Sequence, residues 1–150
     1  MIYEFCAENV TLLEKAMQAG ARRIELCDNL AVGGTTPSYG VTKAAVELAA
    51  NYDTTIMTMI RPRGGDFVYN DLEIAIMLED IRLTAQAGSQ GVVFGALTAD
   101  KKLDKANLEK LIAASKGMEI VFHMAFDELS DEDQLEAIDW LSQAGVARIL

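Results

Sequence analysis

Short apolar segments alternate with amphipathic segments along the whole chain. The apolar runs lie at Ile2–Cys6, Arg23–Leu26, Thr55–Ile60, Gly91–Leu97, Glu119–Phe122 and Arg148–Leu150. Between them apolar residues recur at helical spacing, most clearly at Ile74, Met77, Leu78, Ile81 and Ala85. No Asn-Gly or Asp-Gly hairpin turn separates neighbouring runs, so the pattern favours parallel strands joined by helices. We therefore expect five βα units followed by a sixth strand.

Capping residues mark where several of these helices begin and end. The predicted starts are Asn70, Asp104 and Ser130, and the predicted ends are Gly88, Gly117 and Gly145. Glu73 follows Asn70 by three residues, which is typical of a capping box. The helix from Ser130 is expected to bury Leu135, Ile138 and Leu141 on one face.

Two architectures contain parallel strands covered by helices: the doubly wound sheet and the (β/α)8 barrel. A doubly wound nucleotide-binding sheet carries a glycine-rich turn after its first strand, whereas residues 4–9 contain no glycine. The barrel agrees better, although a complete one needs at least about 200 residues. We expect residues 1–150 to form a single α/β domain, the truncated N-terminal portion of a TIM barrel that lacks its C-terminal part.

Composition narrows the range of partners. The chain is 51% hydrophobic and 24% charged, as in ordinary globular domains. Its formal net charge of −10 opposes binding to nucleic acid or to an anionic membrane, so we expect neither as a partner. Two cysteines, an N-terminus unlike a signal peptide and the lack of a long apolar run indicate a cytoplasmic protein. Homo-oligomer contacts could account for the acidic helices.

Glutamate and cysteine side chains form the first candidate site. The tripeptides Glu4–Cys6 and Glu25–Cys27 are expected to end the first two strands. Alternation along a strand places Glu and Cys on one face and the intervening Phe5 or Leu26 on the other. If the apolar residues face the helices, both carboxylates and both thiols face the barrel mouth, where TIM-barrel active sites lie.

These groups allow more than one interpretation. Soft thiolates select Cu(I), which makes Cys27 the first candidate ligand and Cys6 the second. The cysteines can instead be small buried core residues, and the two glutamates can pair with Arg61 or Arg63. The methionines at 57 and 59 are interpreted mainly as core residues, although they could assist a copper site.

The segment Arg61–Asp66 follows the third strand and forms the second candidate site. Arg61 and Arg63 can clamp a carboxylate or a phosphate, and the Gly64-Gly65 turn lets backbone N–H groups approach the anion. Asp66 would orient these groups. The alternative is a structural turn held by ion pairs.

The only histidine, His123, closes the fifth strand and is followed by Asp127. A histidine there can act as an acid, a base or a metal ligand, and it can equally be a hydrogen-bonded core residue. Glu25, His123 and Asp127 are therefore the candidate catalytic residues, while the candidate metal ligands are Cys27, Cys6 and His123.

Several segments, taken in their order along the chain, together resemble the CutC family. They are Glu25–Cys27, Gly33–Gly40, Ile60–Tyr69, Leu78–Arg82, Phe122–Asp127 and Ala144–Leu150. The resemblance covers the whole chain and implies a cytoplasmic TIM-barrel protein associated with copper homeostasis and copper binding. One position departs from the family: Met124 stands where the family usually has arginine. The missing guanidinium weakens an anion-binding role for this strand, whereas a thioether suits a soft metal.

Two functions remain open at this point. In the first, the chain binds Cu(I) at the mouth of the barrel through Cys27 and Cys6, with His123 or Met124 completing the site. In the second, it is an enzyme that acts on a small anionic metabolite, held by Arg61 and Arg63, while Glu25 or His123 moves a proton.

Overall fold

The computed structural model describes all residues from 1 to 150. Its strands are β1 (Glu4–Glu8), β2 (Arg23–Cys27), β3 (Thr55–Met59), β4 (Gly91–Phe94), β5 (Glu119–Phe122) and β6 (Arg148–Ile149). Its helices are α1 (Leu13–Gln18), α2 (Tyr39–Ala49), α3 (Asp71–Ala87), α4 (Lys105–Ala114) and α5 (Asp131–Gln143), with the short 3₁₀ helices η1 (Leu30–Val32) and η2 (Met124–Glu128).

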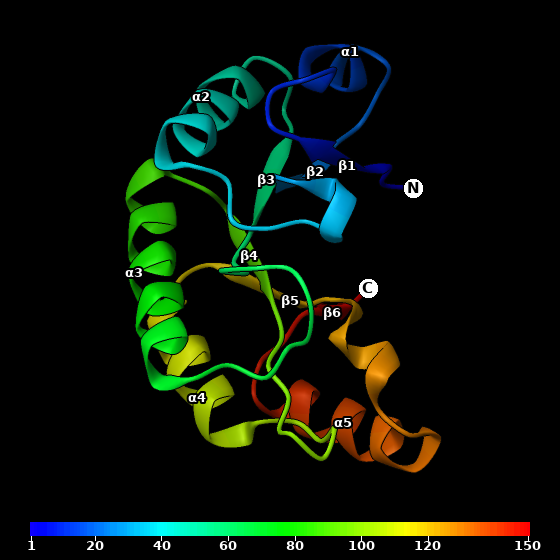
Figure 1. Ribbon diagram of the computed structural model, residues 1–150. Coiled ribbons are helices and arrows are strands. Elements are labelled where there is room, and N and C mark those ends of the chain that lie inside the picture. The colour runs from blue at the N-terminus through cyan, green and yellow to red at the C-terminus, as the bar shows by residue number, and fades with distance from the viewer.

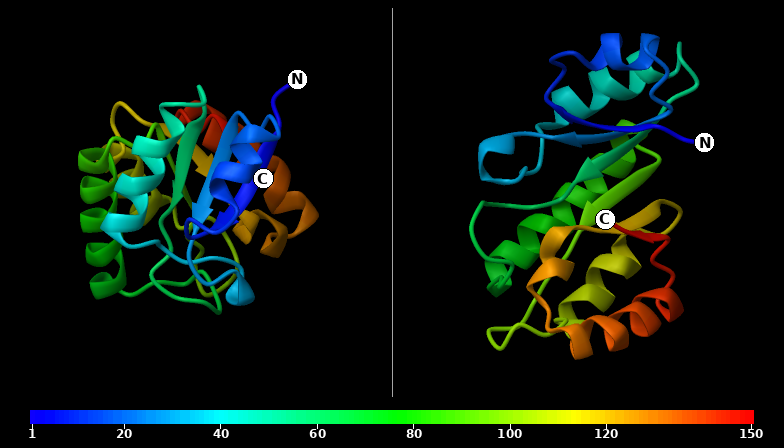
Figure 2. Two further views of the ribbon diagram at one scale, coloured as in Figure 1. Left: turned by 90° about the horizontal axis from the view of Figure 1, so that it is seen from above. Right: turned by 90° about the vertical axis from the view of Figure 1, so that its right-hand side faces the viewer.

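The six strands form one curled parallel sheet. Their order across the sheet is their order along the chain. Figure 1 shows the helices on the outer side of the curve, and Figure 2 shows the same curvature from above and from the side. A doubly wound sheet would reverse its strand order and carry helices on both faces. The chain is therefore a half-barrel of the TIM type, which confirms the predicted fold class.

Alternate residues of each strand pack beneath the helices. Ile24, Leu26 and Ile56 are fully buried in a cluster with residues of α1 and α2. A larger cluster joins the outer faces of β4 and β5 to α3, α4 and α5. Because burying one such side chain contributes about 1.5–3 kcal/mol, the outer face of the sheet holds most of the stabilising apolar contacts.

The interior face carries a smaller cluster made of Cys27, Met57, Met59, Val93 and Val121. Gly91 opens β4 on this face, and a Cβ there would overlap the end of the Met57 side chain and lie 2.7 Å from the Glu119 carbonyl oxygen. The methionine can move aside but the backbone carbonyl of β5 cannot, so its close approach requires glycine at this position.

The first strand lies two residues later than the sequence pattern predicts. We expected it at Ile2–Cys6, ending at Cys6, but β1 runs from Glu4 to Glu8. Pairing with β2 explains the shift, since Cys6 lies opposite Glu25 and Glu8 lies opposite Cys27. Glu4 consequently begins the strand and lies at the far end of the sheet from the mouth. The shift is an even number of residues, so each side chain keeps its predicted face.

Ion pairs fill the interior at the N-terminal ends of the strands. Arg23 Nη1 lies 3.5 Å from Glu4 Oε2, and Arg148 Nη2 lies 3.8 Å from the same carboxylate oxygen. Arg148 also pairs with Glu119 of the neighbouring strand. The interpretation that Glu4 pairs with Arg61 or Arg63 is wrong, because the register sets Glu4 directly beside Arg23.

Most predicted helix ends are confirmed. Asn70 caps α3 in a complete capping box with Glu73, and Gly88 ends it in the left-handed conformation. Asp104 and Ser130 cap α4 and α5. The predicted face of α5 is wrong in part: Leu141 is buried, but Leu135 and Ile138 are exposed. Figure 1 shows α5 at the end of the row of helices, so it has a helical neighbour on one side only.

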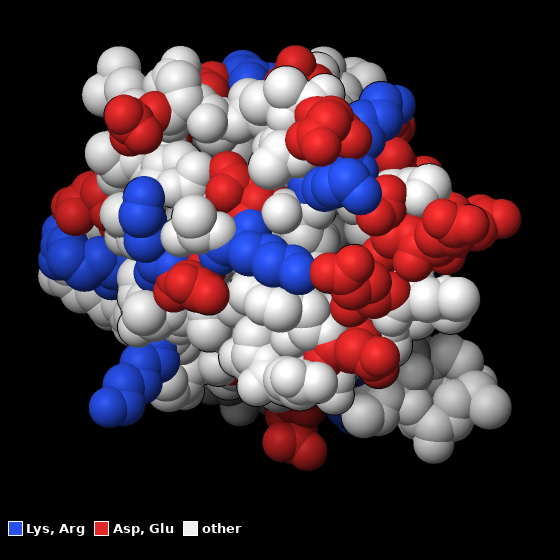
Figure 3. All heavy atoms as spheres, turned by 90° about the horizontal axis from the view of Figure 1, so that it is seen from below, with Lys and Arg blue, Asp and Glu red and all other residues white.

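Charged side chains on the surface occur largely as mixed neighbours. On the face shown in Figure 3, basic side chains lie among acidic ones rather than in one continuous basic patch. Three lysine–carboxylate pairs join the segment around α4 to η2 and α5: Lys101–Glu128, Lys102–Asp133 and Lys105–Glu136. None of the helices combines the length and the apolar character that crossing a membrane requires.

Candidate functional site

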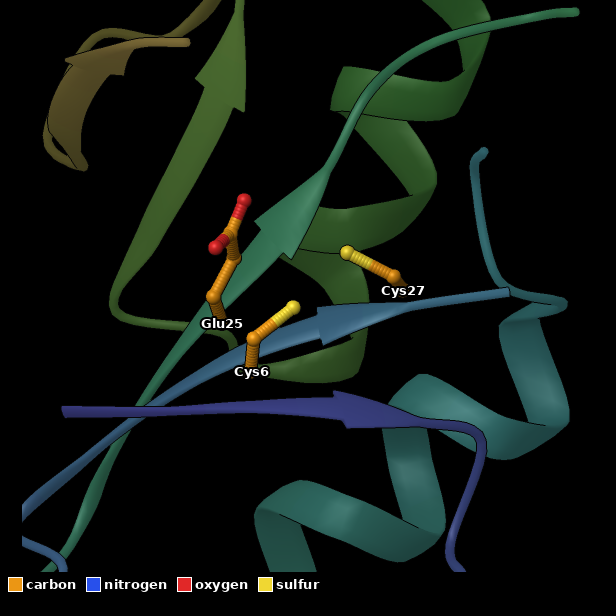
Figure 4. A group of neighbouring side chains, drawn as sticks. All are labelled: Cys6, Glu25 and Cys27. Carbon is orange, nitrogen blue, oxygen red and sulfur yellow. The ribbon is translucent and has the colours of Figure 1, made fainter. Parts of the chain in front are cut away.

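Three potential metal ligands meet on the interior face of β1 and β2. Cys6, Glu25 and Cys27 project to the same side of the two strands, and the two thiols point toward one another (Figure 4). One ligand atom of each residue lies within 4.8 Å of the others. No other three His, Cys, Asp or Glu side chains of the chain come together in this way. Register and alternation thus assemble a small cluster with two sulfur atoms and one carboxylate.

The pKa values of the two thiols are shifted in opposite directions. A hydrogen bond from Cys27 lowers the pKa of Cys6, and the same hydrogen bond, together with burial, raises the pKa of Cys27. Burial, followed by the charge of Glu4, raises the pKa of Glu25. Cys6 is therefore the thiol that ionises first, and Cys27 acts as its hydrogen-bond donor.

Cys27 is enclosed, whereas Cys6 is exposed. Cys27 packs with Met57 and Met59 below the loop that follows β2. Gly34 covers its sulfur so closely that a Cβ at this position would lie 3.0 Å from Cys27 Sγ, and Gly34 has a φ of +87°. Both facts require glycine at position 34. Access to the cluster from solvent is therefore through Cys6.

Arg61 holds the loops above the cluster together. Its side chain is 2% exposed, and its guanidinium donates to the carbonyl oxygens of Val32, Gly34 and Gly65 at 2.8–2.9 Å. These carbonyls belong to the loops after β2 and β3. The guanidinium thus fixes the two loops to one another, and only Nε is left without a partner.

Arg63 faces α3. Its Nε donates to Glu73 at 2.5 Å, and its Nη1 lies 3.0 Å from Asp66. Its guanidinium also stacks over the ring of Tyr69. The structure therefore gives Arg63 two carboxylate partners of its own, whereas the guanidinium of Arg61 binds backbone carbonyls. Gly64 packs against Val32, and Gly65 supplies one of the carbonyls that Arg61 binds.

His123 is buried and neutral. Its Nδ1 accepts a hydrogen bond from the backbone N–H of Ala125, so the ring proton lies on Nε2. Burial, and next the charge of Arg61, lowers its pKa to about 3. His123 is not part of the Cys6–Glu25–Cys27 cluster. With a proton on Nε2 and an acceptor bond at Nδ1, neither nitrogen presents a free lone pair to a metal in this arrangement.

Two further predicted residues follow His123 on η2. Asp127 is exposed and is not part of the cluster. The thioether of Met124 and Nη1 of Arg61 both border Gly33, where a Cβ would lie 3.4 Å from Met124 Sδ and 3.2 Å from Arg61 Nη1. Met124 therefore lies against the loop that covers Cys27.

Three buried donors near the guanidinium of Arg61 have no hydrogen-bond partner. They are Arg61 Nε, His123 Nε2 and the hydroxyl of Tyr69. Arg61 and His123 both pack against Phe67, and Tyr69 lies close enough to Arg61 for the guanidinium to influence its pKa, which burial raises to about 12. Tyr69 was not predicted as a site residue. Its position in a loop gave no local signal of burial, because Tyr69 is buried by the core cluster that joins β4 and β5 to the helices.

The whole chain matches the family model described as "CutC family", over residues 1–150. A family protein CutC of Enterococcus faecalis is 55% identical over 150 residues, which is 100% of this chain and 72% of the relative. A second, of Streptococcus pyogenes, is 53% identical over the same shares.

One solved structure gives the same family match, and a second shares the fold. A crystal structure from Streptococcus agalactiae, named "Putative Copper Homeostasis Protein CutC", superimposes with a TM-score of 0.96 at 49% identity, covering 99% of this chain and 71% of that one. An oxaloacetate acetylhydrolase superimposes with a TM-score of 0.67 at 10% identity, covering 99% of this chain and 58% of that one. At so low an identity this second likeness concerns the fold alone.

Replacing Arg61 tests its role in joining the two loops. We expect Arg61→Met to lower the free energy of unfolding by about 3 kcal/mol, because three carbonyls lose a charged donor. The exposed Arg82, which pairs with Glu79 on α3, provides the control, and Arg82→Met should change stability by less than about 0.5 kcal/mol. Urea unfolding of both variants measures the difference. Equal effects would contradict the assignment.

Acid should destabilise the chain through His123. Its pKa of about 3 in the folded state lies below the unfolded value of 6.5, so its contribution is complete above pH 6.5 and is lost as the pH falls toward 3. In His123→Asn, the amide oxygen can accept the Ala125 N–H without titrating. Between pH 6.5 and 4 we expect the wild type to lose up to about 1.4 kcal/mol per pH unit more than this variant. Parallel stability profiles would show that His123 is not buried in the neutral form.

Proposed function

The chain belongs to the CutC family, and on this premise we propose that it serves copper homeostasis by binding Cu(I) between Cys6 and Cys27. The observation that carries the proposal is the meeting of the two thiols and Glu25 within 4.8 Å on one face of β1 and β2. Copper is the cargo of such a site, and the half-barrel is the scaffold that sets the two sulfur atoms side by side.

The donor set suits a soft monovalent ion. Thiolates select Cu(I), and two of them suffice for a low-coordinate site. Cys6 is the sulfur that ionises first, and binding of the ion at Cys27 displaces the proton that this thiol donates to Cys6. Glu25 is a hard oxygen donor and contributes little to Cu(I), but it would favour a harder divalent ion.

The packing around Cys27 supports a buried sulfur position. Met57 and Met59 surround it on the interior face, and Gly34 closes the space above it. Cys6 is left as the point of entry. A reducing cytoplasm, which keeps both cysteines as thiols and copper as Cu(I), is the compartment in which this site would work.

Substitution of either cysteine tests the copper site. We expect Cys6→Ser and Cys27→Ser each to weaken Cu(I) binding by on the order of 100-fold, because one thiolate alone is a poor site for the ion. An anaerobic competition titration of the full chain with a chromophoric Cu(I) chelator measures this affinity.

Two control variants separate the thiols from their neighbours. Glu25→Gln and Met124→Leu should bind Cu(I) within about threefold of the wild type, because two thiolates suffice for the ion without the carboxylate or the thioether. One tight equivalent that survives in both serine variants would show that the ion binds elsewhere.

A second function is supported by three buried donors that lack a hydrogen-bond partner. Arg61 Nε, His123 Nε2 and the Tyr69 hydroxyl all offer a proton and have no acceptor. We propose, as the alternative, that the chain is an enzyme whose small anionic substrate, a carboxylate or a phosphate, supplies these acceptors. Arg61 would bind the anion through Nε alone, since its other nitrogens hold the loops, and Glu25 or His123 would be the group that moves a proton.

Thermal unfolding with inorganic phosphate or malonate tests this alternative. Millimolar anion should raise the Tm by several degrees if it binds the folded chain. Tyr69→Phe should weaken the binding about tenfold, since it removes one donor. Tyr52→Phe, whose hydroxyl donates to Glu14 instead, should not change it. A Tm that neither anion raises would dismiss the anion site and leave the copper site unaffected.

A further inference from the structure

Cys6 and Cys27 are diagonal neighbours on adjacent parallel strands. Cys6 lies opposite Glu25 in the register, and Cys27 follows two residues later on the same face of β2. Their sulfur atoms lie within 4.8 Å of each other, and Figure 4 shows them pointing toward one another. A disulfide needs the sulfurs to approach to about 2.05 Å and the two Cα atoms to lie within about 7 Å. Diagonal neighbours on paired strands lie about 7–8 Å apart, so closing the bond requires rotation of both side chains and a small movement of β1 toward β2.

We propose that this pair is a reversible oxidation site, in which a hydroperoxide converts the two thiols to an intramolecular Cys6–Cys27 disulfide. This goes beyond the copper site because it requires no metal. The disulfide form and the copper-bound form exclude one another, since sulfurs joined in a disulfide are no longer thiolate ligands.

The difference in exposure assigns the two cysteines different roles. Cys6 is exposed, whereas Cys27 is 1% exposed beneath Gly34. Cys6 is therefore the sulfur that a peroxide molecule reaches. Cys27 is the resolving thiol, because it is shielded from the oxidant and lies next to the sulfur that has been oxidised. The chain contains no third cysteine that could compete.

The chemistry balances in two steps. The Cys6 thiolate attacks one oxygen of hydrogen peroxide, the O–O bond breaks, and a sulfenic acid and water result once a proton is taken up. The Cys27 sulfur then attacks the sulfur of the sulfenic acid, an S–S bond forms, and the hydroxyl group leaves as a second water with the Cys27 proton. Two thiols and one peroxide thus give one disulfide and two waters. A dithiol reductant returns the two electrons by thiol–disulfide exchange.

The position of the pair favours the disulfide over further oxidation of Cys6. A sulfenic acid that waits in solvent proceeds to sulfinic acid with more peroxide. Here the resolving sulfur is on the neighbouring strand, held in place by the parallel pairing of β1 with β2. Closing the bond therefore joins two strands that are already paired and leaves the order of the sheet unchanged.

Intact-mass analysis of the full chain tests the proposal. Reduced, copper-free protein is treated with a small excess of hydrogen peroxide, the reaction is stopped with catalase, and free thiols are alkylated with iodoacetamide after unfolding. We expect a mass lower by two hydrogens, the loss of both alkylation sites, and the return of both after dithiothreitol. Arg82→Met, which changes an exposed side chain on α3 and keeps both thiols and Glu25, should behave in the same way.

The single-cysteine variants identify the attacked sulfur. Cys27→Ser, in which Cys6 has no resolving partner, should gain oxygen atoms at Cys6 under the same treatment. Cys6→Ser should keep a thiol that reacts much more slowly in the folded chain, because Cys27 is enclosed. Wild-type protein that gains oxygen at Cys6 while Cys27 remains alkylatable would overturn the proposal, and so would a disulfide that joins two chains.

The outcome of the oxidation experiment is independent of the copper proposal. The oxidation is measured without copper, so a chain that forms no disulfide can still bind Cu(I) in the titration of its reduced form. Conversely, a disulfide that forms in a chain whose reduced state binds no Cu(I) would sustain the oxidation site and overturn the copper site alone.

Discussion

A charged side chain on any strand of this half-barrel has only one face available to it, because helices cover the other. Leu26 and Ile56 show the constraint: each is fully buried beneath helices, and the residues that alternate with them must point to the interior. The thiols and the carboxylates therefore share one space. Within this space they lie at different positions along the strands. The ion pairs around Arg23 lie at the N-terminal ends of the strands, and the thiols lie nearer the C-terminal ends.

The loops at that opposite end depend on a single buried cation. Arg61 binds carbonyls of the loops after β2 and β3, so the cover over Cys27 and the turn after β3 are fixed by the same guanidinium. A residue that the sequence presents as an anion clamp is thus, first of all, the link between two loops. Arg63, two residues later, is occupied by Glu73 at the start of α3. The pair of arginines consequently serves two separate structural tasks.

Much of the fold could be predicted from the sequence, because its signals are local. Period-two runs, helical periodicity and caps such as Asn70 depend on residues a few positions apart. The candidate cluster was predicted in part: Cys6, Glu25 and Cys27 share a face as expected. Local patterns do not contain the register between strands or the tertiary contacts of each side chain. They could not show that Glu4 lies beside Arg23, that Arg61 turns toward carbonyls, or that Leu135 has no helix to pack against.

The ion pair between Glu4 and Arg148 joins the first strand to the last. Every pairing of neighbouring strands in the sheet is between elements that follow one another along the chain, and a second ion pair, Arg23–Glu119, joins β2 to β5 across the interior. During synthesis on the ribosome, each strand can therefore add to the edge formed just before it, without waiting for a distant segment. Glu4 already has Arg23 as a partner in this growing sheet. Arg23 meets Glu119 once β5 is made, and Glu4 meets Arg148 once β6 is made, so these two ion pairs fix the curvature of the interior in successive steps after the strands have paired.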